Sequence, residues 1–286
     1  MRPRTLVPVL ALAAALVAAA PAQANVASAV RYIAARHDPH GCYQEPGGKP
    51  SIELTAWVVL GLRAAGRPGA VGMGCIAFHA LVLRQWNQVE LAILAAVASG
   101  RNPRNVGGVN FVARLRVLRS GGTYAGQTNA TIFGVLALRA ARAPVPVAVR
   151  RGLLRAQRRD GSFGWIGGVP SDSNMTAAAI QALRALHVSP KATPIRRALV
   201  ALARFRRSNA GYGLNRGDPA DAQSTAWAVQ ALASVGRAAP RARRYLLRLQ
   251  RANGAIPHDL ASGANPVWST AQAVAALRGR PLPGAP

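Results

Sequence analysis

Several kinds of residue are scarce in this chain of 286 residues, and each scarcity argues against a class of protein. Acidic residues number nine and only Lys49 and Lys191 are lysines, so arginine supplies nearly all of a formal net charge of +27. The five histidines are scattered, with no pair at metal-ligand spacing. No serine lies in a nucleophile-elbow motif and no cofactor motif is present. The sequence therefore predicts no metal, no cofactor and no serine-hydrolase centre.

Long uncharged apolar runs are also missing beyond the N-terminus. Two arginines precede an apolar run from Leu6 to Ala20, and Ala22-Gln23-Ala24 has the form of a secretory cleavage site. The run is short for a membrane span, so we expect residues 1–24 to be a signal peptide, with a retained anchor as the alternative. The chain from Asn25 is then expected to be secreted or associated with the cell envelope, without a transmembrane segment.

Cysteine is limited to Cys42 and Cys75. In an oxidising compartment, two such cysteines predict one disulfide, closing a loop of about 33 residues. Two unrelated buried thiols are the alternative.

A phrase built on Thr-Ala recurs six times along the chain, at intervals of roughly 40 residues. Each copy, for example TAWVVLGL or TAAAIQAL, is apolar nearly all the way round, which predicts a helix surrounded by protein. Arginine-rich amphipathic stretches lie between the copies, and no strand-like alternation appears. The copies are anchored at Thr55, Leu91, Thr131, Thr176, Thr225 and Thr270.

We therefore predict an all-α fold, with six apolar helices in an inner ring, each shielded by one Arg-rich outer helix. This closed domain of six helix pairs spans residues 25–279. Residues 280–286 have no apolar period and are expected to be a disordered tail.

A second phrase, a glycine followed two places later by an aromatic or aliphatic residue, links each outer helix to the next inner one. It is clearest in QRRDGSFGW, from Gln157 to Trp165, and in QRANGAI, from Gln250 to Ile256. Glycine ends the outer helix in a left-handed turn. The second repeat, around Arg84-Gln85-Trp86, has lost this turn.

Together, the two phrases resemble the prenyltransferase and squalene-oxidase repeat of the terpenoid cyclase and protein prenyltransferase superfamily. That resemblance implies a single α/α toroid, and it is strongest from Leu153 to Ala276. One fold of this kind hosts many chemistries, so the resemblance implies a fold more than a function.

The catalytic motifs of that superfamily are incomplete here. Class II cyclases carry D-x-D-D before Thr-Ala, where this chain has Asp172-Ser173-Asn174-Met175. Prenyltransferases bind zinc through Asp-x-Cys, where this chain has Asp221-Ala222-Gln223. Asp172 and Asp221 are the remaining catalytic candidates, and both positions also suit helix caps.

Equivalent positions of the six repeats should lie at one height around the ring, so the inner-helix N-termini converge on one mouth. Glu90, Asn129 and Asn174 are expected at its rim. Trp57, Phe133 and Trp227 occupy one equivalent position below the rim, where they either line the cavity or pack between the rings. The predicted ligand-binding residues are Glu53, Trp57, Phe133, Phe163, Trp165, Tyr212, Gln223, Trp227 and Trp268.

These patterns favour a secreted toroid that binds an unknown small-molecule or polymeric ligand without cyclase or prenyltransferase chemistry. The alternative is a divergent terpenoid cyclase-like or polysaccharide-acting enzyme of the same fold. A third hypothesis is a structural envelope protein whose arginines bind acidic cell-wall polymers. No nucleic-acid motif accompanies the arginines, so nucleic acid is not an expected partner.

Overall fold

The computed structural model describes residues 25–286, so the predicted signal peptide lies outside the described residues. Within this range, six helices built on the Thr-Ala phrase form a closed inner ring, in which each helix contacts the next and the last contacts the first. Nearly all of their side chains are buried, as their uniformly apolar sequences predict. These inner helices are α2 (Ile52–Ala64), α4 (Trp86–Ala98), α6 (Thr128–Ala140), α8 (Ser173–Ala185), α10 (Ala222–Ser234) and α12 (Pro266–Leu277).

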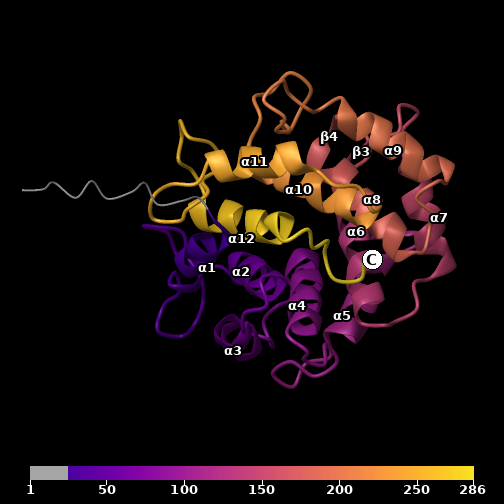
Figure 1. Cartoon of the computed structure of the whole chain (residues 1–286). Coiled ribbons are helices and arrows are strands. Elements are labelled where there is room, and N and C mark those ends of the chain that lie inside the picture. Colours follow the sequence, from indigo (N-terminus) through magenta and orange to yellow (C-terminus); the bar gives the residue numbers. More distant parts are fainter. Residues whose placement is uncertain (1–24) are drawn as a thin grey trace, which may run out of the picture.

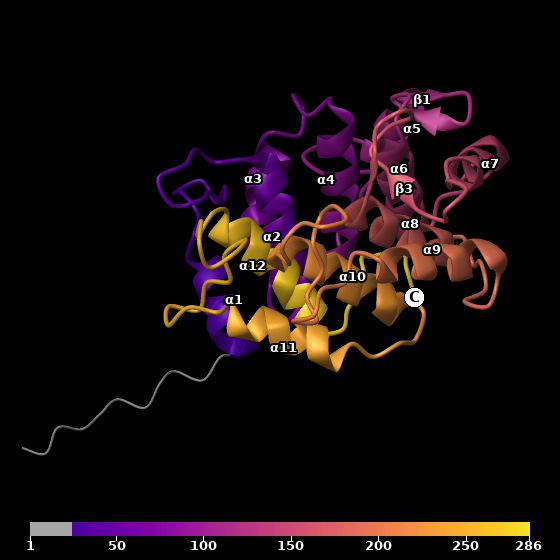
Figure 2. The ribbon, with the colours of Figure 1, turned by 90° about the horizontal axis from the view of Figure 1, so that it is seen from above.

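In residues 25–286, six outer helices cover this ring, so the predicted all-α toroid of six helix pairs is confirmed (Figures 1 and 2). The first outer helix packs on the last inner helix, so the indigo α1 lies beside the yellow α12 and the ring is closed. Gln250 supports the closure, since its Nε2 donates to the Asn25 carbonyl at 3.0 Å and to Ser28 Oγ at 3.1 Å. The outer helices are α1 (Val26–Ala34), α3 (Ala70–Phe78), α5 (Phe111–Val117), α7 (Val147–Arg155), α9 (Thr193–Ala203) and α11 (Pro240–Arg248).

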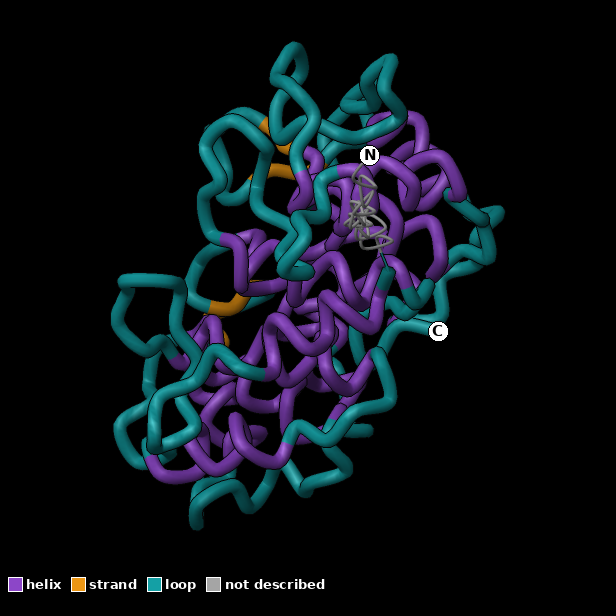
Figure 3. The backbone as a smooth tube through the Cα atoms, turned by 60° about the vertical axis from the view of Figure 1, so that its left-hand side comes forward, coloured by secondary structure: helices purple, strands orange, loops and turns teal. Residues whose placement is uncertain are grey.

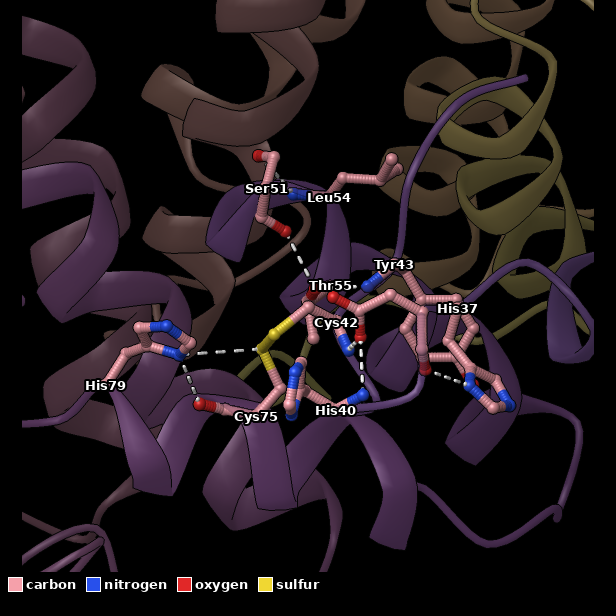
Figure 4. Close-up of a disulfide and its surroundings, with 10 residues drawn as sticks. His37, His40, Cys42, Tyr43, Ser51, Leu54, Thr55, Cys75 and His79 are labelled. Carbon is pink, nitrogen blue, oxygen red and sulfur yellow. Dashed lines mark hydrogen bonds between the residues drawn. A yellow bond between two sulfur atoms is a disulfide. The ribbon is translucent and has the colours of Figure 1, made fainter. Parts of the chain in front are cut away.

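The anchor threonines explain why the two sequence phrases occur together. Thr55 Oγ1 donates to the Ser51 carbonyl at 2.7 Å and accepts the Tyr43 N–H of the preceding loop at 2.8 Å (Figure 4). Thr131, Thr176, Thr225 and Thr270 accept the N–H of Tyr124, Phe163, Tyr212 and Ile256 in the same way. Each threonine therefore satisfies a buried backbone donor and fixes the linking loop to the inner helix.

The second repeat lacks both halves of this contact. Its anchor is Leu91, which has no hydroxyl, and its linking loop has no Gly-x-aromatic turn. The inner helix α4 instead begins directly at Trp86, after a short loop.

Four two-residue strands lie in the linking loops and form two antiparallel pairs (Figure 3). They are β1 (Arg119–Ser120) with β2 (Thr123–Tyr124), and β3 (Phe163–Gly164) with β4 (Ser171–Asp172). Such short ladders position loops and do not make a sheet layer.

Some of the arginines hold the inner ring together at the ends of its helices. Arg63, Arg139 and Arg184 lie in the last turns of α2, α6 and α8. Their Nε atoms donate to the carbonyls of Ala98, Ala185 and Ser234 at 2.9, 2.9 and 3.0 Å, at the ends of the next inner helices. These three side chains use a cation at helix C-termini, where it is favoured.

The predicted disulfide between Cys42 and Cys75 is confirmed, and it ties the first linking loop to α3 (Figure 4). Gly41 makes the approach possible, because its φ is +81° and a Cβ there would lie 2.8 Å from the Val71 carbonyl oxygen. His79 lies beside the sulfur atoms, and its Nδ1 pairs with the Cys75 carbonyl at 3.0 Å. Sulfur atoms bonded to each other are not thiolate ligands, so this cluster does not form a metal site.

The C-terminal tail differs from the expectation that it would be disordered. It crosses the C-terminal ends of the inner helices (Figure 1), where Leu282 is 3% exposed and its N–H donates to Gln181 Oε1 at 2.9 Å. The sequence pattern missed this because a single leucine among prolines has no periodicity. The apolar space left open inside the ring explains its burial.

No helix in residues 25–286 has the length and apolar character needed to cross a bilayer.

Candidate functional site

A cavity of about 590 Å³ opens at the N-terminal end of the inner ring. Every inner helix contributes to its wall, which confirms that the six N-termini converge on one mouth. The loops before α8 and α10 complete the rim with Trp165, Pro170, Leu214 and Asn215. Asp172, the N-cap residue of α8, also lines the cavity. The inner helices supply Glu53 and Trp57, Trp86, Asn87, Glu90 and Leu91, Asn129 and Phe133, Asn174 and Met175, Gln223 and Trp227, and Trp268 and Gln272.

Aromatic side chains from three inner helices meet at the centre of the ring. The ring centroids of Trp57 and Trp227 lie 5.5 Å apart, those of Phe133 and Trp227 5.8 Å, and those of Trp57 and Phe133 6.2 Å. All three pairs are edge-to-face, the geometry that aromatic quadrupoles favour. The equivalent position two residues after the anchor therefore lines the cavity, and its three aromatic rings pack on one another at the centre of the inner ring.

A second aromatic pair lies at the mouth. Trp86 and Trp165 are edge-to-face at 6.3 Å, and Trp165 is 50% exposed. All five tryptophans of the chain consequently line this one cavity. Trp86 was missed from the sequence because the lost glycine turn made it look like the end of an outer helix.

Phe163 and Tyr212, which were predicted to bind ligand, do not line the cavity. They are 0% and 6% exposed and lie under their own linking loops, where Thr176 and Thr225 hold their backbones. The Gly-x-aromatic phrase therefore supplies packing between the helix layers. Glu53, Gln223 and Trp268, by contrast, lie in the cavity wall as expected.

Both catalytic candidates cap their own helices. Asp172 Oδ1 accepts the Met175 N–H at 2.7 Å, and Asp221 Oδ1 accepts the Ser224 N–H at 2.7 Å. Asp221 is not part of the cavity wall and faces His258, whose Nδ1 lies 3.7 Å from its Oδ1. Asp172 does line the cavity, and burial raises its pKa to about 6, although the backbone N–H groups that it accepts oppose the shift.

Glu90 is the most unusual polar group of the wall. Its side chain is 0% exposed, and neither carboxyl oxygen has a hydrogen-bond partner. Burial raises the pKa of Glu90 well above its ordinary value. Glu53, at the rim, accepts hydrogen bonds from Asn87 Nδ2 at 3.0 Å and from Ser51 Oγ at 3.2 Å.

Gly134 makes room for Glu90. A Cβ at Gly134 would lie 3.2 Å from Glu90 Oε1 and 2.5 Å from the Tyr124 ring. The Tyr124 hydroxyl is also buried without a partner, and burial raises its pKa to about 12. Two unpartnered polar groups thus lie beside one glycine of α6.

Comparison with solved structures supports the fold. The chain is similar to the type II terpene cyclase MstE from Scytonema, solved in complex with geranylgeranyl dihydroxybenzoate, with 16% identity and a TM-score of 0.69 over 89% of this chain and 95% of that one. It is also similar to a glycosidase variant, with 13% identity and a TM-score of 0.62 over 90% and 96% of the two chains. Similarity at this level of identity establishes the α/α toroid and leaves the chemistry open.

A further match covers only part of a longer protein. Against the ent-copalyl diphosphate synthase from Streptomyces platensis, the chain shows 21% identity and a TM-score of 0.55, and it spans about half of that protein (82% of this chain, 52% of that one). No family model matches the chain, and neither does any curated protein.

Proposed function

We propose that this chain is an exported member of the prenyltransferase and squalene-oxidase repeat proteins that binds a small apolar molecule in its central cavity without catalysing cyclisation. The observation that carries the proposal is the convergence of all five tryptophans on one cavity of about 590 Å³. A pocket of this size with a mainly apolar surface and a few polar groups is typical of small-molecule sites. The bound molecule in the MstE structure, geranylgeranyl dihydroxybenzoate, illustrates a mainly apolar ligand in a toroid of this kind.

The absence of cyclisation is argued from the residues at the D-x-D-D position. Asp172 is turned back onto the Met175 N–H, and the residue that lines the cavity two places later is the amide Asn174. An amide does not protonate an alkene, so the acid of that motif has no counterpart on α8. Asp221 is likewise occupied by the Ser224 N–H and lies outside the cavity wall.

The test uses the tryptophans as reporters. Farnesol and 1-octanol, both uncharged, are titrated into the protein while its intrinsic fluorescence is recorded. We expect a saturable change with both. Asn174→Arg places a charge at the rim and should weaken the binding of both alcohols. Ser208→Arg adds the same charge on an exposed loop and should leave their binding unchanged. An unsaturable signal, or equal binding by both variants, contradicts a site in the cavity.

A second candidate, an acid-catalysing enzyme of the same fold, is favoured by one observation. Asp172 lines the cavity with a pKa of about 6, so a fraction of it is protonated near neutral pH. The candidate predicts turnover of a geranylgeranyl-bearing phenol or an oligosaccharide that is lost in Asp172→Asn. Product analysis by mass spectrometry that finds both substrates unchanged excludes it for these classes.

A further inference from the structure

The ionisable residues that line the cavity of this protein are acidic, although the chain as a whole is strongly basic. The chain carries a formal net charge of +27, yet in residues 25–286 no arginine, lysine or histidine lines the cavity. The ionisable groups of its wall are the carboxyls of Glu53, Glu90 and Asp172. None of the three belongs to an ion pair in the described chain.

Among the described residues of this wall, the side chains of Glu90 and Gln272 lack any hydrogen-bond partner, and Glu90 is the ionisable one of the two. Buried carboxyls are normally hydrogen-bonded, because removing them from water without a partner costs free energy. Both oxygens of Glu90 lack one, and the nearby polar group, the Tyr124 hydroxyl, is a donor that also lacks one. A cation in the cavity would let Glu90 ionise and would compensate for its burial.

The aromatic wall suits the same kind of ligand. The face of a tryptophan attracts a cation strongly, by about 2 kcal/mol or more where water is excluded. The ring centroid of Trp57 lies 5.5 Å from that of Trp227 and 6.1 Å from that of Trp268. Aromatic enclosures are the usual binding sites of quaternary ammonium groups in proteins, and such a group has no N–H bonds that need acceptors.

An anionic ligand would find little to hold it. The helix N-termini at the rim are the natural anion sites, but carboxylates of this chain already use the amides of three of them. Glu45 accepts the Val267 and Trp268 N–H groups of α12, both at 2.8 Å. Asp172 and Asp221 cap α8 and α10. In α6, the backbone N–H of Asn129 donates to the Trp165 carbonyl at 3.1 Å.

We propose that the ligand of the cavity is an apolar molecule carrying a quaternary ammonium group, held by the tryptophans and by the Glu90 and Glu53 carboxyls. This inference rests on the proposed function, since it names the ligand class of the same cavity. It predicts discrimination between molecules of equal chain length and different charge.

The experiment titrates octyltrimethylammonium, 1-octanol and octyl sulfate into the exported chain, below their micelle concentrations. Tryptophan fluorescence reports the cavity, and salt at about 0.2 M screens the arginines of the exterior. We expect octyltrimethylammonium to bind at least about tenfold more tightly than 1-octanol, with octyl sulfate the weakest. Equal or tighter binding of 1-octanol or octyl sulfate overturns the inference while leaving the proposed function intact. Failure of all three overturns both.

Variants locate the charge. Glu90→Gln keeps the size of the side chain and should weaken octyltrimethylammonium about tenfold, with 1-octanol unchanged. The control Asp160→Asn removes an exposed carboxylate, which is paired with Arg216 at 2.6 Å, and should change neither affinity. Glu53→Gln, whose site is at the rim, serves if Glu90→Gln fails to fold by circular dichroism. If a folded Glu90→Gln or Glu53→Gln variant still prefers octyltrimethylammonium over 1-octanol as strongly as the wild type does, the carboxyls do not hold the ammonium group and the inference is wrong.

Discussion

The exterior and the central cavity of this toroid are built from opposite residue types. Arginine supplies most of the charged residues of the chain, and Arg63, Arg139 and Arg184 donate to carbonyls at helix ends. Tryptophan is rare, yet all five copies line the cavity together with three carboxyls. The high arginine content and the positive net charge therefore describe the outer surface of the protein. The character of the cavity is set by a small number of residues, several of them at equivalent positions of the repeats.

The largest loss of stability is expected on truncating an aromatic side chain at the centre of the inner ring, where Trp57, Phe133 and Trp227 form the floor of the cavity. Trp227→Ala removes the ring that contacts both Trp57 and Phe133, and we expect it to lower the free energy of unfolding by about 3–5 kcal/mol. Phe78→Ala is the matched change on the exterior, where the ring is 81% exposed, and it should cost little. Urea denaturation of both variants measures the difference, and equal losses would contradict the buried floor.

The next effect concerns the covalent link between a loop and an outer helix. Replacing Cys42 and Cys75 by serine opens a bond that spans 33 residues, and we expect a loss of about 3–4 kcal/mol in unfolding free energy. The cavity lies elsewhere, so 1-octanol affinity should be retained below the lowered melting temperature. A double variant that loses affinity while still folded would show that the loop shapes the cavity.

Carboxyls of the two regions should respond to pH with opposite signs. The folded-state pKa of Asp172 is about 6, above the ordinary value of 3.8, so its contribution is fully present below pH 3.8 and is lost as pH rises through 6. Relative to Asp172→Asn, the wild type should lose about 2 kcal/mol of stability between pH 4 and pH 7. Arg158 lies near enough to oppose the shift and is unchanged in both proteins.

The exterior carboxyl Asp160 supplies the contrast. Burial acts to raise the pKa of Asp160, but hydrogen bonds from Ser162 and the guanidiniums of Arg216 and Arg204 outweigh it and hold the pKa below its ordinary value. Stability from Asp160 is therefore present above the ordinary pKa and is lost as pH falls below 4. Denaturation of Asp160→Asn and the wild type across pH 2–7 checks this sign. If Asp160→Asn and Asp172→Asn change the pH dependence of the unfolding free energy in the same direction, the two carboxyls do not lie in opposite environments.

The smallest change in stability is expected in the turns that link an outer helix to the next inner helix. Ala210 has a φ of +71° at the position where Gly161 has +90° and Gly254 has +92° in other repeats. Ala210→Gly should relieve this strain and stabilise the protein by about 0.5–1 kcal/mol. Gly161→Ala should do the reverse, since its Cβ would lie 2.4 Å from the Arg197 carbonyl oxygen. Thermal melts of both variants give the two signs.

The sequence predicted the ring and much of its cavity because both follow from repetition. An apolar helix around every anchor required a closed inner layer, and position two after the anchor brought Trp57, Phe133 and Trp227 together. Phe163 and Tyr212 were misassigned, because a repeated aromatic has the same pattern whether it packs in the wall or faces the cavity. Only the Thr176 and Thr225 contacts decide that they pack.

Two details of the site that depart from the repeat could not be predicted: that Trp86 belongs to the cavity wall, and that Glu90, although expected at the rim, is buried without a hydrogen-bond partner. Trp86 lies in the repeat that lost its turn, and Glu90 lies at a position occupied by Leu54 and Ala130 in neighbouring repeats. Its burial without a partner depends on Gly134 of the next helix, a relation between residues far apart in sequence. The burial of Leu282 likewise depends on the space that the ring leaves inside its C-terminal end.

The most direct test of the central claim is native mass spectrometry of the protein purified from the cells that produce it. If the cavity is a ligand site, the protein carries an additional small mass that is released on activation, and Asn174→Arg lacks it while Ser208→Arg retains it. A bare polypeptide mass for the wild type, or the same adduct on Asn174→Arg, would contradict a ligand-binding role for the cavity.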